Sequence, residues 1–440
     1  MKFKKTKFIA LCLVAVFVFF FSNDFGIIDI EKTAIITAVA IDITDNGEYE
    51  VTAQIAVPEA TDANTENKKA QISGTGSTVA SAIKNIGDIS GWFPSLSFCN
   101  IIIVGNKVAQ DNVIKVLDYF SNTLRMQDSA LVILSEEDAK NVLTTSTPLD
   151  NISSFALQKI IYKNPGFDND IAHTDIKTFC VGYYSYTKSA IMPMVKIIKE
   201  TEDNDSVNGG SGGTNSGLGS GSASSESGAS SGGGSSSSGG GSSGGSSGGS
   251  SSGASGSGNE SSNSNKGSTL FDARTTALFY DGKLVGSLLP HQTLAYNMLK
   301  SSFAGTTIEV TGVKQGLKTA NYLLTAIRTT PKVKVFADEN SVNLDLSVNV
   351  YCRLADENTR ESGNKYLNSS TLPYEVIERA EEQLTDAFSE LIEVSKQTGC
   401  DFLELKKQLY RYQHKYYAKY KDEFFNALNV SVNVKVSGQK

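Results

Sequence analysis

The hydrophobic and polar positions of the chain alternate between strand-like and helix-like patterns. β-rich runs over residues 34–43 and 49–57 flank Asn46-Gly47, a pair that favours the positive backbone angles of a tight turn, so a β-hairpin is predicted. Two shorter runs, 99–105 and 130–135, are almost wholly apolar, which is typical of strands buried on both faces. Helical spacing of apolar residues predicts three helices, over residues 78–89, 111–120 and 136–143. The pattern therefore predicts a layered α/β domain.

The second half of the chain also mixes strands and helices. Two β-rich runs, 272–280 and 283–289, flank Asp281-Gly282 and predict a second hairpin. Apolar residues alternate with polar ones over residues 342–352, which predicts a half-buried antiparallel strand. Further strands are predicted over residues 190–199, 332–336 and 430–436. Helices are predicted over residues 290–299, 374–396 and 402–420, and Gly399 marks the end of the second.

A basic and then apolar segment opens the chain. Four lysines within the first seven residues precede an uncharged apolar run over residues 8–21, the layout of an export signal or signal anchor. Residues 19–24 contain no small-residue cleavage pattern, so we expect an uncleaved single-pass anchor with its basic end inside. The run is shorter than the roughly 20 residues of a spanning helix, and flanking residues extend it. The predicted anchor residues are Phe8, Ile9, Leu11, Leu13, Val14, Val16, Phe17, Val18, Phe19, Phe20 and Phe21.

A segment rich in glycine and serine interrupts the middle of the chain. Residues 209–267 hold 22 of the 39 glycines. Because the segment has almost no apolar side chains, ordering it would cost roughly 1–2 kcal/mol per residue of backbone entropy with little burial in return. We therefore expect a disordered linker over residues 206–268, inserted as a long surface loop. A tether that reaches a partner is the functional alternative.

Composition excludes several classes of protein. The 40 basic and 47 acidic residues give a net charge of −7, and phosphate contacts need a basic surface, so we expect no nucleic-acid partner. The five cysteines form no Cys-x-x-Cys pair, and their odd number fits neither a disulfide framework nor a zinc cage. They are Cys12, Cys99, Cys180, Cys352 and Cys400. We expect no structural metal and no cofactor.

The histidines and paired carboxylates form no catalytic motif. His173, His291 and His414 fall in different predicted segments and match no metalloprotease or nucleophile frame. Glu136-Glu137 and Glu381-Glu382 are adjacent on predicted helices and point apart, so neither is an acid/base pair by itself. We therefore predict a protein that is not an enzyme and that has no identifiable small-molecule site.

The sequence Gly74-Thr75-Gly76-Ser77-Thr78 resembles a phosphate-binding loop. It lacks the lysine of a P-loop and the third glycine of a dinucleotide fingerprint. We interpret it instead as the entry to a helix that Ser77 or Thr78 caps.

Tyrosines are concentrated in the predicted helix over residues 402–420. Tyrosine has one polar tip, so such residues pack at a core edge more often than they form a binding face. Both interpretations remain open for Tyr410, Tyr412, Tyr416, Tyr417 and Tyr420.

These patterns predict a mixed α/β fold of the α+β class, with several sheets flanked by helices and one N-terminal anchor helix before them. Residues 1–29 form the basic segment and anchor, and residues 30–168 an N-terminal α/β domain. Residues 169–300 form a middle β-rich domain interrupted by the linker. Residues 301–440 form a C-terminal α+β domain with a long helix over 374–397.

The order of these segments resembles the Ger(x)C family, the C subunit of spore germinant receptors. The hairpin over residues 34–60 matches that family's opening block, including Gly47 and Pro58. The sequences GSTVASAIKNI and CNIIIVGNKVA follow in register, and TALFYDGKLVGSLLPHQT and the pattern over residues 399–405 have equivalents further on. Members usually begin as lipoproteins with a Gly-Cys-Trp-Asp boundary, whereas this chain reads Ser22-Asn23-Asp24. An uncleaved helix in place of lipid attachment would be the stronger anchor.

The resemblance implies a non-catalytic subunit of a nutrient germinant receptor in spore germination. Its expected location is the outer face of the spore inner membrane. Its expected partners are the polytopic A- and B-type subunits of the same receptor, and which surface binds them is unknown. A wall-associated adhesin or scaffold is the alternative, because it would also combine an anchor with a Ser/Gly tract.

Overall fold

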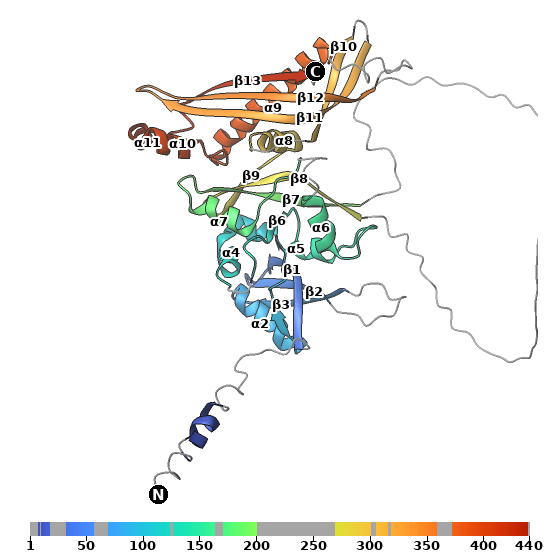
Figure 1. Ribbon diagram of the computed structural model, residues 1–440, viewed down its shortest axis with the longest axis vertical. Helices are drawn as coiled ribbons and strands as arrows, with labels where there is room; N and C mark the ends of the chain where they lie inside the picture. Colours follow the sequence, from blue (N-terminus) through green and yellow to red (C-terminus); the bar gives the residue numbers. More distant parts are fainter. Residues whose placement is uncertain are drawn as a thin grey trace, which may run out of the picture. The chain divides into compact units, whose positions relative to one another are not determined.

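The computed structural model describes residues 8, 10–17, 32–56, 69–123, 126–162, 170–199, 269–300, 305–315, 318–358 and 372–438. Residues 10–17 are helical, and within the described ranges no helix is long and apolar enough to cross a membrane. From residue 33 onward the chain forms two β-sheets with helices packed on them (Figure 1). The predicted mixed α+β class is therefore confirmed, whereas the anchor helix remains a prediction. The predicted linker lies outside the described residues.

Within the part of the chain that the structure describes, the first sheet contains nine strands in the order β3-β2-β1-β5-β6-β7-β8-β9, with β4 beside the start of β1. Its strands are β1 (Thr33–Ile43), β2 (Tyr49–Ala56), β3 (Lys69–Gly76), β4 (Phe93–Ser95), β5 (Ile101–Val104), β6 (Leu131–Ser135), β7 (Ser189–Lys199), β8 (Thr269–Tyr280) and β9 (Lys283–Leu288). The central strands β1, β5, β6 and β7 are parallel, and antiparallel hairpins flank them on both sides. Both predicted hairpins are confirmed.

Helices cover both faces of this sheet, which explains why its central strands lack polar alternation. Ile102 and Val104 of β5 lie in a core with α2 (Val79–Ser90), α4 (Ile114–Ser121) and α7 (Ile176–Tyr184). Their neighbours Ile101 and Ile103 lie in the opposite core with α5 (Ala139–Thr144) and α6 (Ser153–Ile161). A parallel strand buried on both faces needs apolar side chains at every position.

The strands β7 and β8 pair with each other although the glycine-rich segment separates them in sequence. Their antiparallel register runs from Ser189 opposite Tyr280 to Lys199 opposite Thr269. The chain therefore leaves the sheet after Lys199 and returns to it at the neighbouring position. The nine-stranded sheet consequently includes strands from both the 30–168 and the 169–300 segments.

The second sheet contains four strands in the order β10-β11-β12-β13. They are β10 (Thr306–Gln315), β11 (Lys318–Ala337), β12 (Val342–Asn358) and β13 (Leu428–Gly438). The accompanying helices are α8 (Pro290–Met298), α9 (Tyr374–Thr398), α10 (Leu405–Tyr412) and α11 (His414–Tyr420). The long helix predicted over this region is present as α9. Ile191 and Leu278 of the first sheet are buried in the same core as this sheet and its helices, so one core joins the two sheets.

Two predicted elements differ from the observed ones in extent. The strand predicted over 332–336 is part of β11, which is much longer and contains Pro331. β10 pairs only with the first half of β11, so the second half, which contains Pro331, lies at an edge of the sheet. Proline is tolerated at such an edge. The single helix predicted over 402–420 is two helices, because the side chain of Gln413 accepts a hydrogen bond from the Ala337 amide at 2.7 Å and its backbone leaves the helical region.

The helix predicted over 111–120 also differs, because the region contains two short helices. They are α3 (Asn106–Asp111) and α4, and α4 begins only at Ile114. The side chain of Asn112 between them accepts a hydrogen bond from the Ile114 amide at 2.9 Å. This local bond favours a break in the helix, because it offers the backbone an alternative to the helical bond.

The glycine-rich entry to α2 has a structural role. Thr78 caps the helix as predicted, since its hydroxyl accepts a hydrogen bond from the Ser81 amide at 3.1 Å. A Cβ atom on Gly74 would lie 2.4 Å from the backbone oxygen of Ala82, and one on Gly76 would lie 2.2 Å from the Ser81 hydroxyl. The two glycines therefore let β3 pass close to α2, which accounts for the pattern without a nucleotide.

We expect Gly74→Ala to destabilise the protein by about 1–3 kcal/mol, because the added methyl group meets backbone that cannot move alone. Urea unfolding of the purified chain, followed by circular dichroism, measures the change. Gly286→Ala is the matched control, since its Cβ would contact only the methyl group of Thr398 at 2.9 Å. Equal unfolding midpoints for Gly74→Ala and wild type would contradict this explanation of the motif.

Candidate functional site at the junction of the two sheets

A tight turn after α9 connects the C-terminal helices to the first sheet. Gly399 ends α9 with φ 68°, a conformation that favours glycine. The Ser395 hydroxyl donates to the Cys400 carbonyl oxygen at 2.7 Å, which holds the turn against α9. The Cys400 thiol donates to the carbonyl oxygen of Phe279 in β8 at 3.2 Å. The turn is therefore fixed to both its own helix and the nine-stranded sheet.

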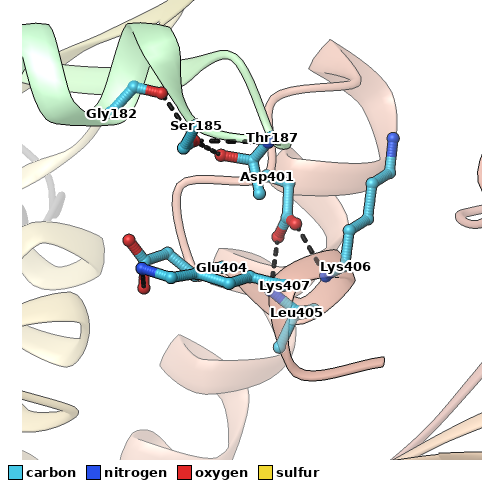
Figure 2. Close-up of polar contacts among 8 residues, drawn as sticks. All are labelled: Gly182, Ser185, Thr187, Asp401, Glu404, Leu405, Lys406 and Lys407. Atoms are coloured by element: carbon cyan, nitrogen blue, oxygen red, sulfur yellow. Dashed lines mark hydrogen bonds and ion pairs between the residues drawn. The ribbon is translucent and has the colours of Figure 1, made fainter. Parts of the chain in front are cut away.

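Asp401 is the centre of this turn. Its side chain accepts hydrogen bonds from the amides of Leu405 and Lys406, both at 2.8 Å, and thereby satisfies the first turn of α10 (Figure 2). Its own amide donates to the hydroxyl of Ser189, the first residue of β7, at 2.9 Å. Only 1% of Asp401 is exposed. One buried residue therefore binds α10 and β7 at once.

The environment of Asp401 makes its protonation sensitive to pH near neutrality. Burial raises the pKa of the Asp401 carboxyl to about 7, although the amides of Lys406 and Leu405 favour the ionised form. The charged neighbours on the same turn are Lys406, which lowers the pKa, and Glu404, which raises it. The carboxyl group therefore gains a proton within the range in which most aspartates remain ionised.

The loop between α7 and β7 forms the other side of the junction. The Ser185 hydroxyl donates to the Gly182 carbonyl oxygen at 2.6 Å and lies 2.8 Å from the Thr187 hydroxyl (Figure 2). Tyr186 lies between Ser185 and Thr187 in the sequence. Its ring stacks on Tyr410 of α10, with the ring centroids 4.1 Å apart and the two hydroxyl groups 3.1 Å apart. This pair extends the junction to the protein surface.

The sequence left open whether the tyrosines of α10 and α11 pack at a core edge or form a binding face. Tyr420 is buried, and Tyr416 and Tyr417 pack at the edge of the core. Tyr410 contacts Tyr186, whereas Tyr412 is 72% exposed. Most of the group therefore packs within the molecule, and Tyr412 is accessible.

Asp42 in β1 repeats the arrangement of Asp401 within the first sheet. Its two carboxylate oxygens accept hydrogen bonds from the amides of Ala139 and Lys140 at 2.8 and 2.9 Å, which fixes the start of α5. A Cβ atom on Gly105 would lie 2.0 Å from the Asp42 carboxylate, so glycine is required beside it. Burial raises the pKa of Asp42. The residue is structural, since both of its oxygens are occupied by the fold.

The three histidines lie in separate environments in the structure. His291 contacts Glu390 at 2.7 Å, and this contact holds the pKa of the Glu390 carboxyl below its usual value. His173 packs against Tyr162, and His414 lies beside Tyr410 and Tyr417. Each of these histidines contacts a structural neighbour rather than another histidine or a thiol.

Three of the thiols are buried. Burial raises the pKa of Cys99, Cys352 and Cys400 to about 12 each, so they stay protonated at neutral pH. Over the described ranges, no three His, Cys, Asp or Glu side chains lie close enough together to hold a metal ion.

A cavity of ≈ 130 Å³ lies between α8, α9, α10 and the second sheet. Its walls are mostly aliphatic, and its polar side chains are Tyr296, Lys300 and Gln408. The Lys300 ammonium lies 4.8 Å from the centroid of the Tyr296 ring. No carboxylate is among the described residues that line the cavity.

The predicted anchor residues lie partly within the described ranges. Phe8, Leu11, Leu13, Val14, Val16 and Phe17 belong to the N-terminal helical stretch and are 55% to 67% exposed. Ile9, Val18, Phe19, Phe20 and Phe21 lie outside the described residues.

A local feature of the sequence indicates the role of Asp401. An acidic residue just before a predicted helix is a helix-start signal, and Asp401 precedes the helix predicted from residue 402. The bond from Asp401 to Ser189 had no such signal, because these residues lie 212 positions apart.

We expect the contribution of Asp401 to the stability of the protein to fall as the pH rises between about 4 and 7. The folded state binds this proton more tightly than the unfolded state, since the pKa is raised from 3.8 to about 7. The stabilisation is complete below the unfolded pKa and is lost as the pH rises through 7. Asp401→Asn has no titrating group, so its stability should change less between pH 5 and pH 7.5 in urea unfolding.

Asp345→Asn serves as a control for this comparison, because Asp345 is exposed on β12. This variant should keep the pH dependence of the wild type. If Asp401→Asn showed the same pH dependence as wild type and control, the titration of Asp401 would not contribute to stability.

Two protein-family models match the chain, one on each side of the glycine-rich segment. Residues 26–197 match the family model described as spore germination protein N-terminal domain, and residues 274–438 match the model described as spore germination B3/GerAC like, C-terminal. No curated protein matches the chain. The crystal structure of the GerBC protein superposes with a TM-score of 0.44 at 14% identity, covering 90% of this chain and 96% of that chain. The two family matches leave out mainly the ends of the chain and the glycine-rich segment, and the chain therefore belongs to the Ger(x)C family of spore germination proteins.

Proposed function

We propose that this protein is a non-catalytic, membrane-anchored subunit of a nutrient germinant receptor. Its folded part lies on the outer face of the spore inner membrane, and an uncleaved N-terminal helix over residues 8–21 holds it there. Its partners are the polytopic A- and B-type subunits of the same receptor. These subunits carry the nutrient pocket and any conduction path.

The observation that carries this proposal is the succession of the two family matches, which together span both sheets. The chemistry of the described residues agrees with a role in binding rather than catalysis. The buried carboxylates of Asp401 and Asp42 fix the first turns of helices, and the buried Cys400 thiol stays protonated. His291 contacts Glu390. Such a protein acts by stabilising one state of its partners.

The junction at Asp401 connects the two sheets, so a partner bound to one sheet would affect the other. A partner that contacts one sheet would act on the other through the 399–405 turn, because this turn is bonded to β7, β8 and α10. Anchoring next to the partners raises the effective concentration of the folded part at the membrane.

We expect the purified, membrane-extracted protein to retain its first residues, because its sequence has neither a cleavage pattern nor a lipidation cysteine. Intact mass spectrometry of the extracted protein measures this directly. A mass that lacks about 22 residues would refute the uncleaved anchor. A mass increased by a diacylglyceryl group would refute it as well.

Deletion of the gene should leave spores that form in normal numbers and germinate when their cortex is opened artificially, but that no longer respond to one class of nutrient. Complementation with the full chain should restore the response, whereas a chain that begins at residue 30 should restore it weakly. Affinity capture of the full chain from spore inner membrane in mild detergent should recover both polytopic subunits.

A deletion strain that responds to every nutrient, in the absence of a paralogous subunit, would overturn the receptor proposal. That outcome would favour the alternative of a wall-associated adhesin or scaffold. Capture of wall components in place of the polytopic subunits would point the same way.

A further inference from the structure

Four large apolar side chains are exposed at the end of the first sheet where β1 begins. Ile89 is 65% exposed, Trp92 49%, Phe93 47% and Phe98 59%. Soluble surfaces carry single exposed apolar residues, but a group of large ones indicates contact with another phase or molecule. We call these four residues, three with aromatic rings and the neighbouring Ile89, the aromatic edge.

The backbone of the aromatic edge is held by the fold. Phe93 pairs with Thr33 in the parallel β4–β1 register, and the Asn100 amide donates to the Thr37 carbonyl oxygen at 3.0 Å. Since strands rise about 3.3 Å per residue, Phe93 and the residues next to Phe98 lie within about 13 Å of each other along β1. The rings are therefore presented on a rigid frame, so binding would cost little conformational entropy.

Buried residues lie close to Phe98 in the sequence. Leu96 and Cys99 point into the core, with 5% and 0% exposure, on either side of Phe98. The exposure of Phe98 therefore does not result from a loose loop, because the residues around it are packed.

No charged residue occurs between Ile89 and Asn106 in the sequence. The polar side chains within the edge are small hydroxyls, such as Ser95 and Ser97, whose oxygens lie 3.2 Å apart. Tryptophan is enriched at the boundary between lipid headgroups and acyl chains, because its ring is amphipathic. Aromatic residues are also enriched at protein interfaces, so the choice of a lipid partner rests on the position of the edge beside the predicted anchor.

The position of the edge in the chain limits how far it can lie from the predicted anchor. The predicted anchor ends at residue 21, and β1 starts at Thr33 beside Phe93. Twelve residues span at most about 43 Å when fully extended. The aromatic edge is therefore tethered within that distance of the point where the anchor leaves the bilayer.

We propose that the aromatic edge inserts into the headgroup region of the same bilayer that holds the N-terminal anchor. This contact is a second attachment, and it fixes the orientation of the first sheet on the membrane. It rests on the proposed function in that it requires the anchor to lie in a bilayer. Because the edge is uncharged, the contact does not depend on anionic lipid.

Trp92 is the only tryptophan of the chain and reports on this contact directly. The full chain is reconstituted into phosphatidylcholine nanodiscs, and its fluorescence is measured with lipids brominated either near the headgroup or near the end of the acyl chain. We expect blue-shifted emission relative to the unfolded chain and at least twofold stronger quenching by the shallow bromines. An increase from 50 to 500 mM salt should leave the quenching unchanged, because no charge takes part.

A relocated tryptophan provides the matched control. Tyr412 on α10 is 72% exposed, so the double variant Trp92→Phe, Tyr412→Trp carries one accessible indole away from the aromatic edge. Its emission should be solvent-like and unquenched. Separately, the variant Phe93→Ser, Phe98→Ser should lose at least half of the Trp92 quenching, and circular dichroism confirms that it is folded.

Each outcome decides the proposal. Unquenched Trp92 in a chain that floats with the nanodiscs overturns the aromatic edge as a lipid contact and leaves the anchor intact. A chain that does not float with the nanodiscs overturns both the anchor and the edge. A blue shift of the Trp92 emission that appears only after the polytopic partner subunits are added, without quenching by the brominated lipids, identifies the edge as a protein interface and also overturns the proposal.

Discussion

The two sheets of this protein depend on a few hydrogen bonds made by the turn between α9 and α10. Asp401 binds the first amides of α10 with its carboxylate and Ser189 with its backbone, while Cys400 binds β8. A carboxylate removed from water is costly unless its hydrogen bonds are complete, so the turn has few alternative geometries. The bonds that begin α10 therefore act together with the hydrophobic core that joins the two sheets.

The parts of the fold that sequence predicted are those governed by local rules. The hairpin around Gly47 follows from turn chemistry, and the buried strands β5 and β6 follow from uninterrupted apolar runs. The cap of α2 by Thr78 and the end of α9 at Gly399 follow from the free backbone groups at helix ends. The family resemblance rested on these same blocks, and the family matches agree with it.

The parts that sequence missed depend on contacts between distant residues. Nothing near Gln413 indicates a break in the helix, because its partner is the Ala337 amide at the end of β11. Pro331 argues locally against a strand, and only the limited reach of β10 makes it acceptable. The role of Ser189 was hidden for the same reason, and so was the exposure of the aromatic rings beside β1. Whether an apolar side chain is exposed or buried depends on the folded surface. A hydrophobic pattern in the sequence does not distinguish the two cases.

The pairing of Lys199 with Thr269 has an evolutionary consequence. Paired strands bring their backbones within about 5.5 Å of each other, so the chain enters and leaves the intervening segment at almost the same place. Each doubling of such a segment costs only about 0.6 kcal/mol of closure entropy. Insertions and deletions here are therefore nearly neutral for the sheet. This position can accumulate repeats, or accept a foreign domain, while selection continues to act on the strands that flank it.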